Sequence, residues 1–306
     1  MSPVDSKGVR RKVPWWARIA LKIVLARLPV PYRWWKQIHL FEHGTMDRPA
    51  EAVKTVLVHA RTAGLVDDSG SAPRLIARPG FTMLEIGPGD SLASGVAAYA
   101  LGAERSILVD TGDFASRDLQ LYRDLVEHLG ARGYRAPIAE ARESVDSVLV
   151  AAGVTYLTHG VDSLAGLPAA SVDFCFSNAV MEHVPKADFE RMAREMARVL
   201  RPDGVCVHRV DFQDHLGGGL NNLRFSERVW EGRLFADSGF YTNRIRPRAM
   251  CALFEAAGLT CEVARELRWP AMPIQRAALD ERFRRLSDDD LLVYGMDLRL
   301  RHAMNG

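Results

Sequence analysis

The segment 81–102 reads FTMLEIGPGDSLASGVAAYALG and combines three local patterns in immediate succession. Phe81 to Ile86 is a short apolar run that suits a buried strand, and a helix of small residues is expected from about Leu92 to Leu101. Between them, Gly87-Pro88-Gly89 permits a tight turn and a close approach of a ligand, because glycine has no side chain. A strand, a glycine turn and a helix present backbone N–H groups to a polar ligand at the carboxyl edge of a sheet.

The glycine turn leaves two classes of nucleotide ligand open. A nicotinamide fingerprint, G-x-G-x-x-G, needs glycine at its sixth position, where this chain has Leu92. An acidic residue, Glu85, precedes the turn by two positions, which disfavours a pyrophosphate and suits a ligand with a cationic amino acid end. The pattern therefore favours a nucleoside ligand with a cationic amino acid end, and a nicotinamide-dependent oxidoreductase remains the alternative.

A second buried strand, Ser106 to Val109, ends in Asp110. Two carboxylate oxygens at this place can accept hydrogen bonds from both hydroxyls of a ribose. The same aspartate could instead cap the helix that follows. Its spacing from the glycines favours contact with a ribose.

Further downstream, the order of motifs resembles one enzyme family. Leu84 to Gly89 resembles motif I of the class I S-adenosylmethionine-dependent methyltransferases. The strand from Ser171, with its Glu-His-Val ending at Val184, and the helix closed by Leu-Arg-Pro-Asp-Gly at residues 200–204 resemble later motifs of that family. A predicted helix over 140–152, inserted before the strand Val154 to Leu157, departs from the family pattern.

The resemblance implies an α/β fold with a Rossmann-like seven-stranded sheet, mostly parallel with an antiparallel C-terminal hairpin strand, and helices on both faces. It implies S-adenosyl-L-methionine as the cofactor and methyl transfer as the reaction. It also assigns, by position in the motifs, the residues that hold the cofactor: Glu85, Gly87, Gly89, Asp110, Asp162, Ser177 and Asn178.

The acceptor is expected where the fifth strand ends, near Asp211, Asp214 and His215. Methyl transfer to an oxygen needs in-line placement and a base for the hydroxyl proton. We expect His215 to be the base, oriented by Asp214 or Asp211; a turn capped by Asp214 is the structural alternative. His183 is a further catalytic candidate. A metal held by Asp211, Asp214 and a histidine has no recognisable ligand spacing, so no metal is expected.

The chain has 306 residues and a net charge of +2, which is unevenly distributed. Residues 1–38 contain nine Lys and Arg and one Asp, together with four of the six tryptophans. We therefore expect a basic, Trp-rich helical extension over 1–45 and a methyltransferase domain over 46–306, with a lid or acceptor insertion at about 212–245. The residues leave open whether segment 10–38 contacts a membrane surface, packs on its own domain or forms a homodimer.

The expected function is transfer of a methyl group, by in-line SN2 displacement, to a hydroxyl of a small-molecule, sugar or lipid-linked acceptor. A non-catalytic, cofactor-binding adaptor at a membrane surface stays an alternative. Nucleic acid is not an expected partner, because the mildly acidic body offers no basic stripe. Four widely spaced cysteines form no C-x-x-C pair, which fits a reducing cytoplasm, with peripheral membrane contact through the extension.

Overall fold

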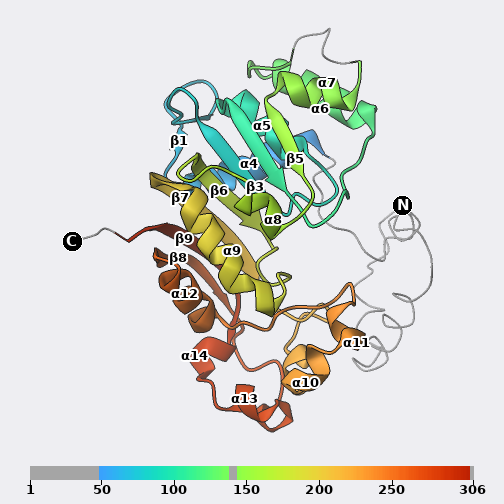
Figure 1. The fold of residues 1–306 in the computed structure, drawn as a ribbon, viewed down its shortest axis with the longest axis vertical. Coiled ribbons are helices and arrows are strands. Elements are labelled where there is room, and N and C mark those ends of the chain that lie inside the picture. Colours follow the sequence, from blue (N-terminus) through green and yellow to red (C-terminus); the bar gives the residue numbers. More distant parts are fainter. Residues whose placement is uncertain (1–47, 138–142, 304–306) are drawn as a thin grey trace.

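A seven-stranded sheet forms the centre of the computed structural model, which describes residues 48–137 and 143–303. The strands lie in the order β5-β4-β3-β6-β7-β9-β8 (Figure 1). Along the chain they are β3 (Thr82–Ile86), β4 (Arg105–Val109), β5 (Val154–Leu157), β6 (Val172–Asn178), β7 (Leu200–Asp211), β8 (Leu259–Arg268) and β9 (Val293–His302). A separate antiparallel pair joins β1 (Val66–Asp67) to β2 (Arg74–Leu75).

Six strands of the large sheet run in the same direction, and β9, between β7 and β8, runs antiparallel to them. β3 pairs in parallel with both β4 and β6, whereas β9 pairs antiparallel with β7 and with β8. Every residue of β3 is buried, as expected for a parallel strand covered on both faces. The predicted fold class, including the antiparallel C-terminal hairpin, is therefore confirmed.

Helices cover both faces of the sheet, and the alternation of side chains along the strands supplies both cores. Met83 and Phe174 point to the face covered by α4 (Pro49–Ala63), α5 (Ala93–Leu101), α6 (Leu119–Gly130) and α7 (Val145–Ala151). Leu84 and Cys175, one residue further along, point to the face covered by α8 (Val161–Ala165), α9 (Lys186–Val199) and α12 (Pro247–Ala256).

The inserted helix predicted before β5 is present as α7. It begins at a capping box, in which the Ser144 hydroxyl accepts from the Ser147 backbone and the Ser147 hydroxyl accepts from the Ser144 backbone. Val145 and Val148 of α7 are buried against the same core as α5 and α6. The insertion therefore extends one face of the sheet and leaves the strand order unchanged.

Short helices fill the region beyond β7 and between the last two strands (Figure 1). They are η2 (Asn221–Arg224), α10 (Glu227–Trp230), α11 (Arg233–Ala236), η3 (Arg276–Ala278), α13 (Glu281–Arg284) and α14 (Asp288–Leu291). Trp230 and Phe283 are buried at the centres of two small apolar clusters of this region. In the part of the chain that the structure describes, no helix combines the length and apolar character needed to cross a membrane.

Candidate active site

The glycine loop follows β3 directly and lies against the segment that follows β6. Gly87 and Gly89 have φ of 72° and 65°, a region that L side chains rarely adopt. A Cβ on Gly87 would lie 2.5 Å from a methyl carbon of Val180, so the loop has no room for a side chain there. The two segments therefore meet at the carboxyl edge of the sheet, where α/β folds bind nucleotides.

Asp110 lies at the end of β4 and is directly linked to the glycine loop. Its Oδ2 accepts a hydrogen bond of 3.0 Å from the Gly89 backbone N–H, and its Oδ1 accepts one of 2.7 Å from Thr111. A carboxylate offers about four lone-pair sites, so one carboxylate can accept several hydrogen bonds at once. The structure brings the predicted glycines and the predicted ribose carboxylate together.

Glu85 lies beneath the loop and is 3% exposed. Its carboxyl accepts a hydrogen bond from the Ser94 hydroxyl of α5, so it joins the strand to the helix on either side of the loop. Burial, with a smaller contribution from the charge of Asp110, raises the pKa of Glu85 to about 8. This buried carboxyl therefore fixes β3 and α5 relative to each other on either side of the glycine loop.

The other cofactor candidates lie in three different settings. Asn178 is exposed at the end of β6, whereas the neighbouring Ser177 is fully buried and its hydroxyl is 2.9 Å from Nδ1 of His208. The Asp162 side chain is 72% exposed and forms a 2.7 Å ion pair with Arg191 of α9. Asn178 is thus the open polar group at this edge, and Ser177 supports it from the core.

The Asp214 carboxylate accepts hydrogen bonds from residues of its own loop. Its carboxylate accepts from the Leu216 backbone at 3.0 Å, and from the backbone and side chain of Asn221 at 2.5 and 3.0 Å. It is 2% exposed. The carboxylate therefore organises residues 214–221, which matches the structural alternative of a capped turn.

Asp211 ends β7 and lies half-buried. Its Oδ1 accepts from the Gln213 backbone at 2.9 Å, and burial raises the pKa of its carboxyl above the ordinary value. The charge of His183 lowers the pKa of Asp211, which indicates that the two side chains are close.

The two histidine candidates are in contact with each other. The rings of His183 and His215 are stacked, with centroids 4.8 Å apart. Nδ1 of His183 lies 2.9 Å from the carbonyl oxygen of Tyr241. Because a carbonyl only accepts, Nδ1 carries the proton in the neutral ring, and the lone pair is on Nε2.

Two residues that were not predicted shape this cluster. Glu182 is buried, and its Oε1 accepts from the Asp211 backbone at 3.3 Å; burial raises the pKa of Glu182 to about 8. Asn243 donates from its side chain to the carbonyls of Met181 at 2.7 Å and Val184 at 2.9 Å. The Glu-His pair was a visible signal for Glu182, but nothing near Asn243 in the sequence indicates its partners.

Two groups of side chains among the described residues have donor sets that could hold a metal. One is Glu182, His183 and His215, whose ligand atoms lie within 4.8 Å of one another. The other is Cys175, Cys206 and His208, which are all buried between β6 and β7. The cysteines are far apart in sequence but face each other because the two strands are neighbours.

Comparisons with known proteins agree with this geometry. The model of the methyltransferase domain family matches residues 84–208, from β3 into β7. No curated protein matches the sequence.

Similar solved structures include several methyltransferases. The N1-methyltransferase of 1,6-didemethyltoxoflavin from Burkholderia thailandensis has 14% identity and a TM-score of 0.43, with 99% of this chain and 93% of that chain covered. Mitomycin 7-O-methyltransferase has 16% identity and a TM-score of 0.42, with coverages of 96% and 70%. An arsenic(III) S-adenosylmethionine methyltransferase from Chlamydomonas reinhardtii has 21% identity and a TM-score of 0.41, with coverages of 83% and 74%.

These structural likenesses are too distant to carry an argument about the reaction. The matched domain model covers the glycine loop, Asp110 and the Glu-His-Val segment, and these lie together at one edge of the sheet. Residues 84–208 thus form a methyltransferase domain, and the protein is an S-adenosylmethionine-dependent methyltransferase.

Proposed function

We propose that this enzyme transfers a methyl group to a hydroxyl of a small-molecule, sugar or lipid-linked acceptor. The observation that carries the proposal is the contact between the two loops. Val180 lies against Gly87, and His183, with its lone pair on Nε2, follows three residues later. This contact supports a base in the Val180–His183 segment, next to the loop where the cofactor is expected.

The residues present fit S-adenosylmethionine. Gly87 and Gly89 keep side chains away from the loop, and the Gly89 backbone N–H holds the Asp110 carboxylate beside it. We assign Gly87, Gly89, Asp110 and Asn178 to direct contact, Glu85 and Ser177 to support, and Asp162 to the adenine side. When bound, the cofactor supplies an electrophilic methyl group on a sulfonium.

His183 is the group we propose as the base, in place of His215. Its Nε2 would accept the proton of the acceptor hydroxyl as the new oxygen–carbon bond forms. The Tyr241 carbonyl fixes the ring and stabilises the proton on Nδ1, and the Asp211 carboxylate lies near enough to favour the imidazolium. His215 stacks on the ring and limits its rotation.

Segment 212–245 would form the wall of the acceptor site. Tyr241, which orients His183, belongs to this segment, and its ring packs with Trp230 at a centroid distance of 6.4 Å. The proposed domain division, 1–45 and 46–306, follows from the sequence. The extension and its contact with a membrane or a second copy, through residues 10–38, lie outside the described residues.

The decisive experiment supplies the purified enzyme with isotopically labelled S-adenosylmethionine and a cell extract, and then identifies the labelled product. We expect a methyl ether in a small or lipid-like molecule. The parallel measurement is calorimetry with S-adenosylhomocysteine and with NAD. Binding of NAD without any affinity for S-adenosylhomocysteine would overturn the proposal in favour of an oxidoreductase, and label on nitrogen or carbon would refute the hydroxyl acceptor.

A further inference from the structure

A second cavity, of about 630 Å³, lies between α9, α12 and the α13–α14 segment. This volume is within the range of small-molecule sites. Most of its surface is apolar and comes from residues such as Ala252 and Leu253 of α12, Phe283 and Leu286. Arg244, Ile245 and Arg246 line this cavity and also a small pocket that contains Glu182 and Asp211, so the cavity shares a wall with the cluster described above.

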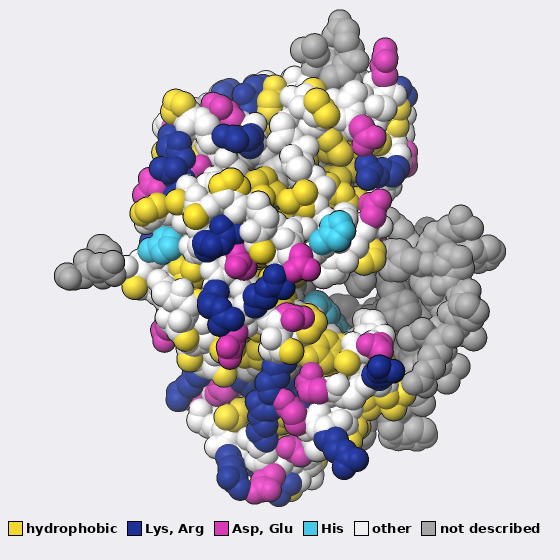
Figure 2. Space-filling model, viewed as in Figure 1, with side chains coloured by type: hydrophobic (Ala, Val, Ile, Leu, Met, Phe, Trp, Pro, Cys, Tyr) yellow, Lys and Arg dark blue, Asp and Glu magenta, His cyan; other side chains and the backbone are white. Residues whose placement is uncertain are grey.

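Basic side chains surround this apolar surface. Six Lys and Arg residues line the cavity, against the two acidic residues Glu190 and Asp290. Figure 2 shows Lys and Arg side chains gathered over the lower part of the face, where Figure 1 places α12, α13 and α14. The Arg248 and Arg285 side chains are 72% and 76% exposed, and their ion pairs with Asp289 and Glu281 are exposed too. Exposed ion pairs are weak, so these arginines can turn toward a bound group.

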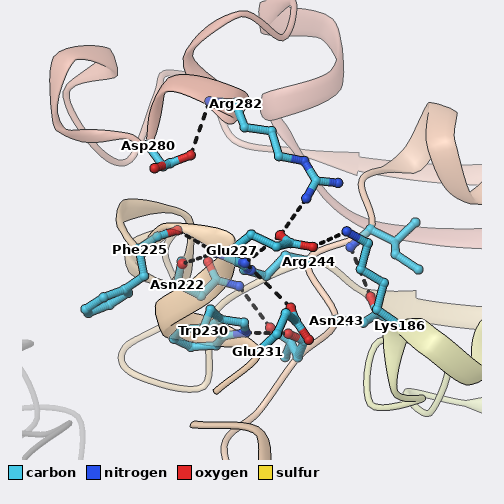
Figure 3. Close-up of polar contacts among 12 residues, drawn as sticks. Lys186, Asn222, Phe225, Glu227, Trp230, Glu231, Asn243, Arg244, Asp280 and Arg282 are labelled. Atoms are coloured by element: carbon cyan, nitrogen blue, oxygen red, sulfur yellow. Dashed lines mark hydrogen bonds and ion pairs between the residues drawn. The ribbon is translucent and has the colours of Figure 1, made fainter. Parts of the chain in front are cut away.

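At one end of the cavity, three cations share two carboxylates. Three cations, Lys186, Arg244 and Arg282, converge on the single carboxylate of Glu227, with Arg244 at 2.9 Å and Arg282 at 2.5 Å (Figure 3). Glu231 lies further from Arg244, at 3.5 Å. A cluster with more cations than carboxylates attracts an anion.

Two arginines at the bottom of the cavity have unused donors. Arg244 and Arg246 are 5% and 4% exposed, and among the described residues Nε of each has no hydrogen-bond partner. The terminal nitrogens of Arg246 donate to backbone carbonyls, including those of Asp290 and Val293 at 2.7 Å each. A buried, charged guanidinium bound by neutral carbonyls keeps a positive potential at this site.

We propose that this cavity binds an amphiphile with an anionic head, such as a phosphate, and an aliphatic chain. The basic rim would take the head, and Ala252, Leu253, Phe283 and Leu286 would take the chain. An inorganic anion alone would leave the apolar surface uncovered, and a neutral amphiphile would leave the rim unpaired. That such a molecule is also the methyl acceptor rests on the proposed function, whereas its binding does not.

The test is calorimetry on the full chain with decyl phosphate below its critical micelle concentration. Decyl maltoside, decyltrimethylammonium and inorganic phosphate are the comparison ligands. We expect decyl phosphate to bind at least about tenfold more tightly than each of them, and added salt to weaken it. Equal affinity for decyl maltoside, or no saturable binding of decyl phosphate, would overturn the proposal.

Two variants separate the parts of the site. The double substitution Arg248→Glu and Arg285→Glu should raise the dissociation constant of decyl phosphate about tenfold, because each exposed charge contributes modestly. Ala252→Trp should weaken binding as strongly by filling the apolar surface, since Ala252 is exposed on α12. Arg61→Glu, at an exposed, ion-paired arginine of α4 on the other face of the sheet, is the matched control.

The outcomes distinguish this inference from the methyl transfer. Thermal unfolding confirms that each variant folds, and Ala252→Trp tests the site even if the double variant does not fold. Hexaglutamate that binds as tightly as decyl phosphate and is insensitive to Ala252→Trp would identify a site for acidic peptides instead. A labelled reaction product without an anionic group would break the link to the acceptor while leaving methyl transfer intact.

Discussion

The rings of His183 and His215 stack at a centroid distance of 4.8 Å with 20° between their planes, although they belong to different loops. Nδ1 of His183 lies 2.9 Å from the backbone carbonyl of Tyr241, so the lone pair of the neutral ring is on Nε2. His183→Ala should therefore lower kcat by about 10²- to 10⁴-fold, the range for loss of a general base. His215→Ala should reduce it less, because His215 only restricts the His183 ring. Steady-state kinetics with the identified acceptor measures both.

The control for the histidine pair is His128→Ala, on α6 at the other face of the sheet, which should retain full activity. The affinity for S-adenosylhomocysteine should be unchanged in all three variants. A larger loss of kcat in His215→Ala than in His183→Ala would restore the original assignment of His215 as the base.

Asp110 is expected to determine cofactor affinity. Asp110→Asn retains the size of the side chain but removes the charge that accepts from the Gly89 N–H and from the ribose. Hydrogen bonds to a charged group contribute about 1.5–3 kcal/mol, so the dissociation constant of S-adenosylhomocysteine should rise about ten- to a hundredfold. Calorimetry measures it, with Asp113→Asn at an exposed carboxylate as the control. Unchanged affinity would remove Asp110 from the site.

Gly87 and Gly80 separate the effect of backbone conformation from that of space. Both have positive φ, but a Cβ on Gly80 would meet nothing nearer than 3.9 Å, whereas on Gly87 it would lie 2.5 Å from Val180. Gly80→Ala should cost about 1 kcal/mol of unfolding free energy, and Gly87→Ala more. Adding Val180→Ala to Gly87→Ala should recover part of the difference. Urea unfolding tests this, and equal losses at the two glycines would contradict the close contact.

Glu85 should make stability depend on pH. The folded chain keeps its proton up to about pH 8, whereas the unfolded chain releases it near 4.5, so folding becomes less favourable as pH rises between these values. The substitution Glu85→Gln removes this pH-dependent loss of stability, because the glutamine side chain does not ionise. Its unfolding free energy should equal that of the wild type near pH 4.5 and exceed it by up to about 3 kcal/mol near pH 7.

Urea unfolding across this pH range measures the difference between Glu85→Gln and the wild type. Glu104→Gln, at an exposed glutamate, is the matched control. A difference for Glu85→Gln that is constant with pH would show that the Glu85 carboxyl is already ionised in the folded enzyme.

Removal of divalent cations should not slow methyl transfer. In the proposed mechanism, Nε2 of His183 takes the proton of the acceptor hydroxyl, and Asp211 stabilises the resulting imidazolium. Neither group is then a metal ligand. The rate should be the same before and after treatment with EDTA. A loss of rate that is reversed by one added metal would instead assign Glu182, His183 and His215 as ligands.

Much of the fold could be predicted because its signals are local. The apolar run before Gly87, the turn after Leu200 and the capping serine of α7 each act over a few residues. The role that we propose for His183, in place of His215, could not be predicted. It depends on the carbonyl of Tyr241, which is 58 residues away from His183 in the chain.

The amino-acid sequence alone determined the strand, glycine turn and helix over 81–102, the aspartate at the end of the next strand, and the fold class. These features follow from periodicity and from residue types that have few conformational options. Only the tertiary structure decided that Asp214 serves its own loop, that Asn243 holds the segment of Glu182, and that basic residues of α9, α12, α13 and their flanking segments surround one apolar cavity. Such contacts join residues far apart in the chain, and the packing of whole elements determines which side chains meet.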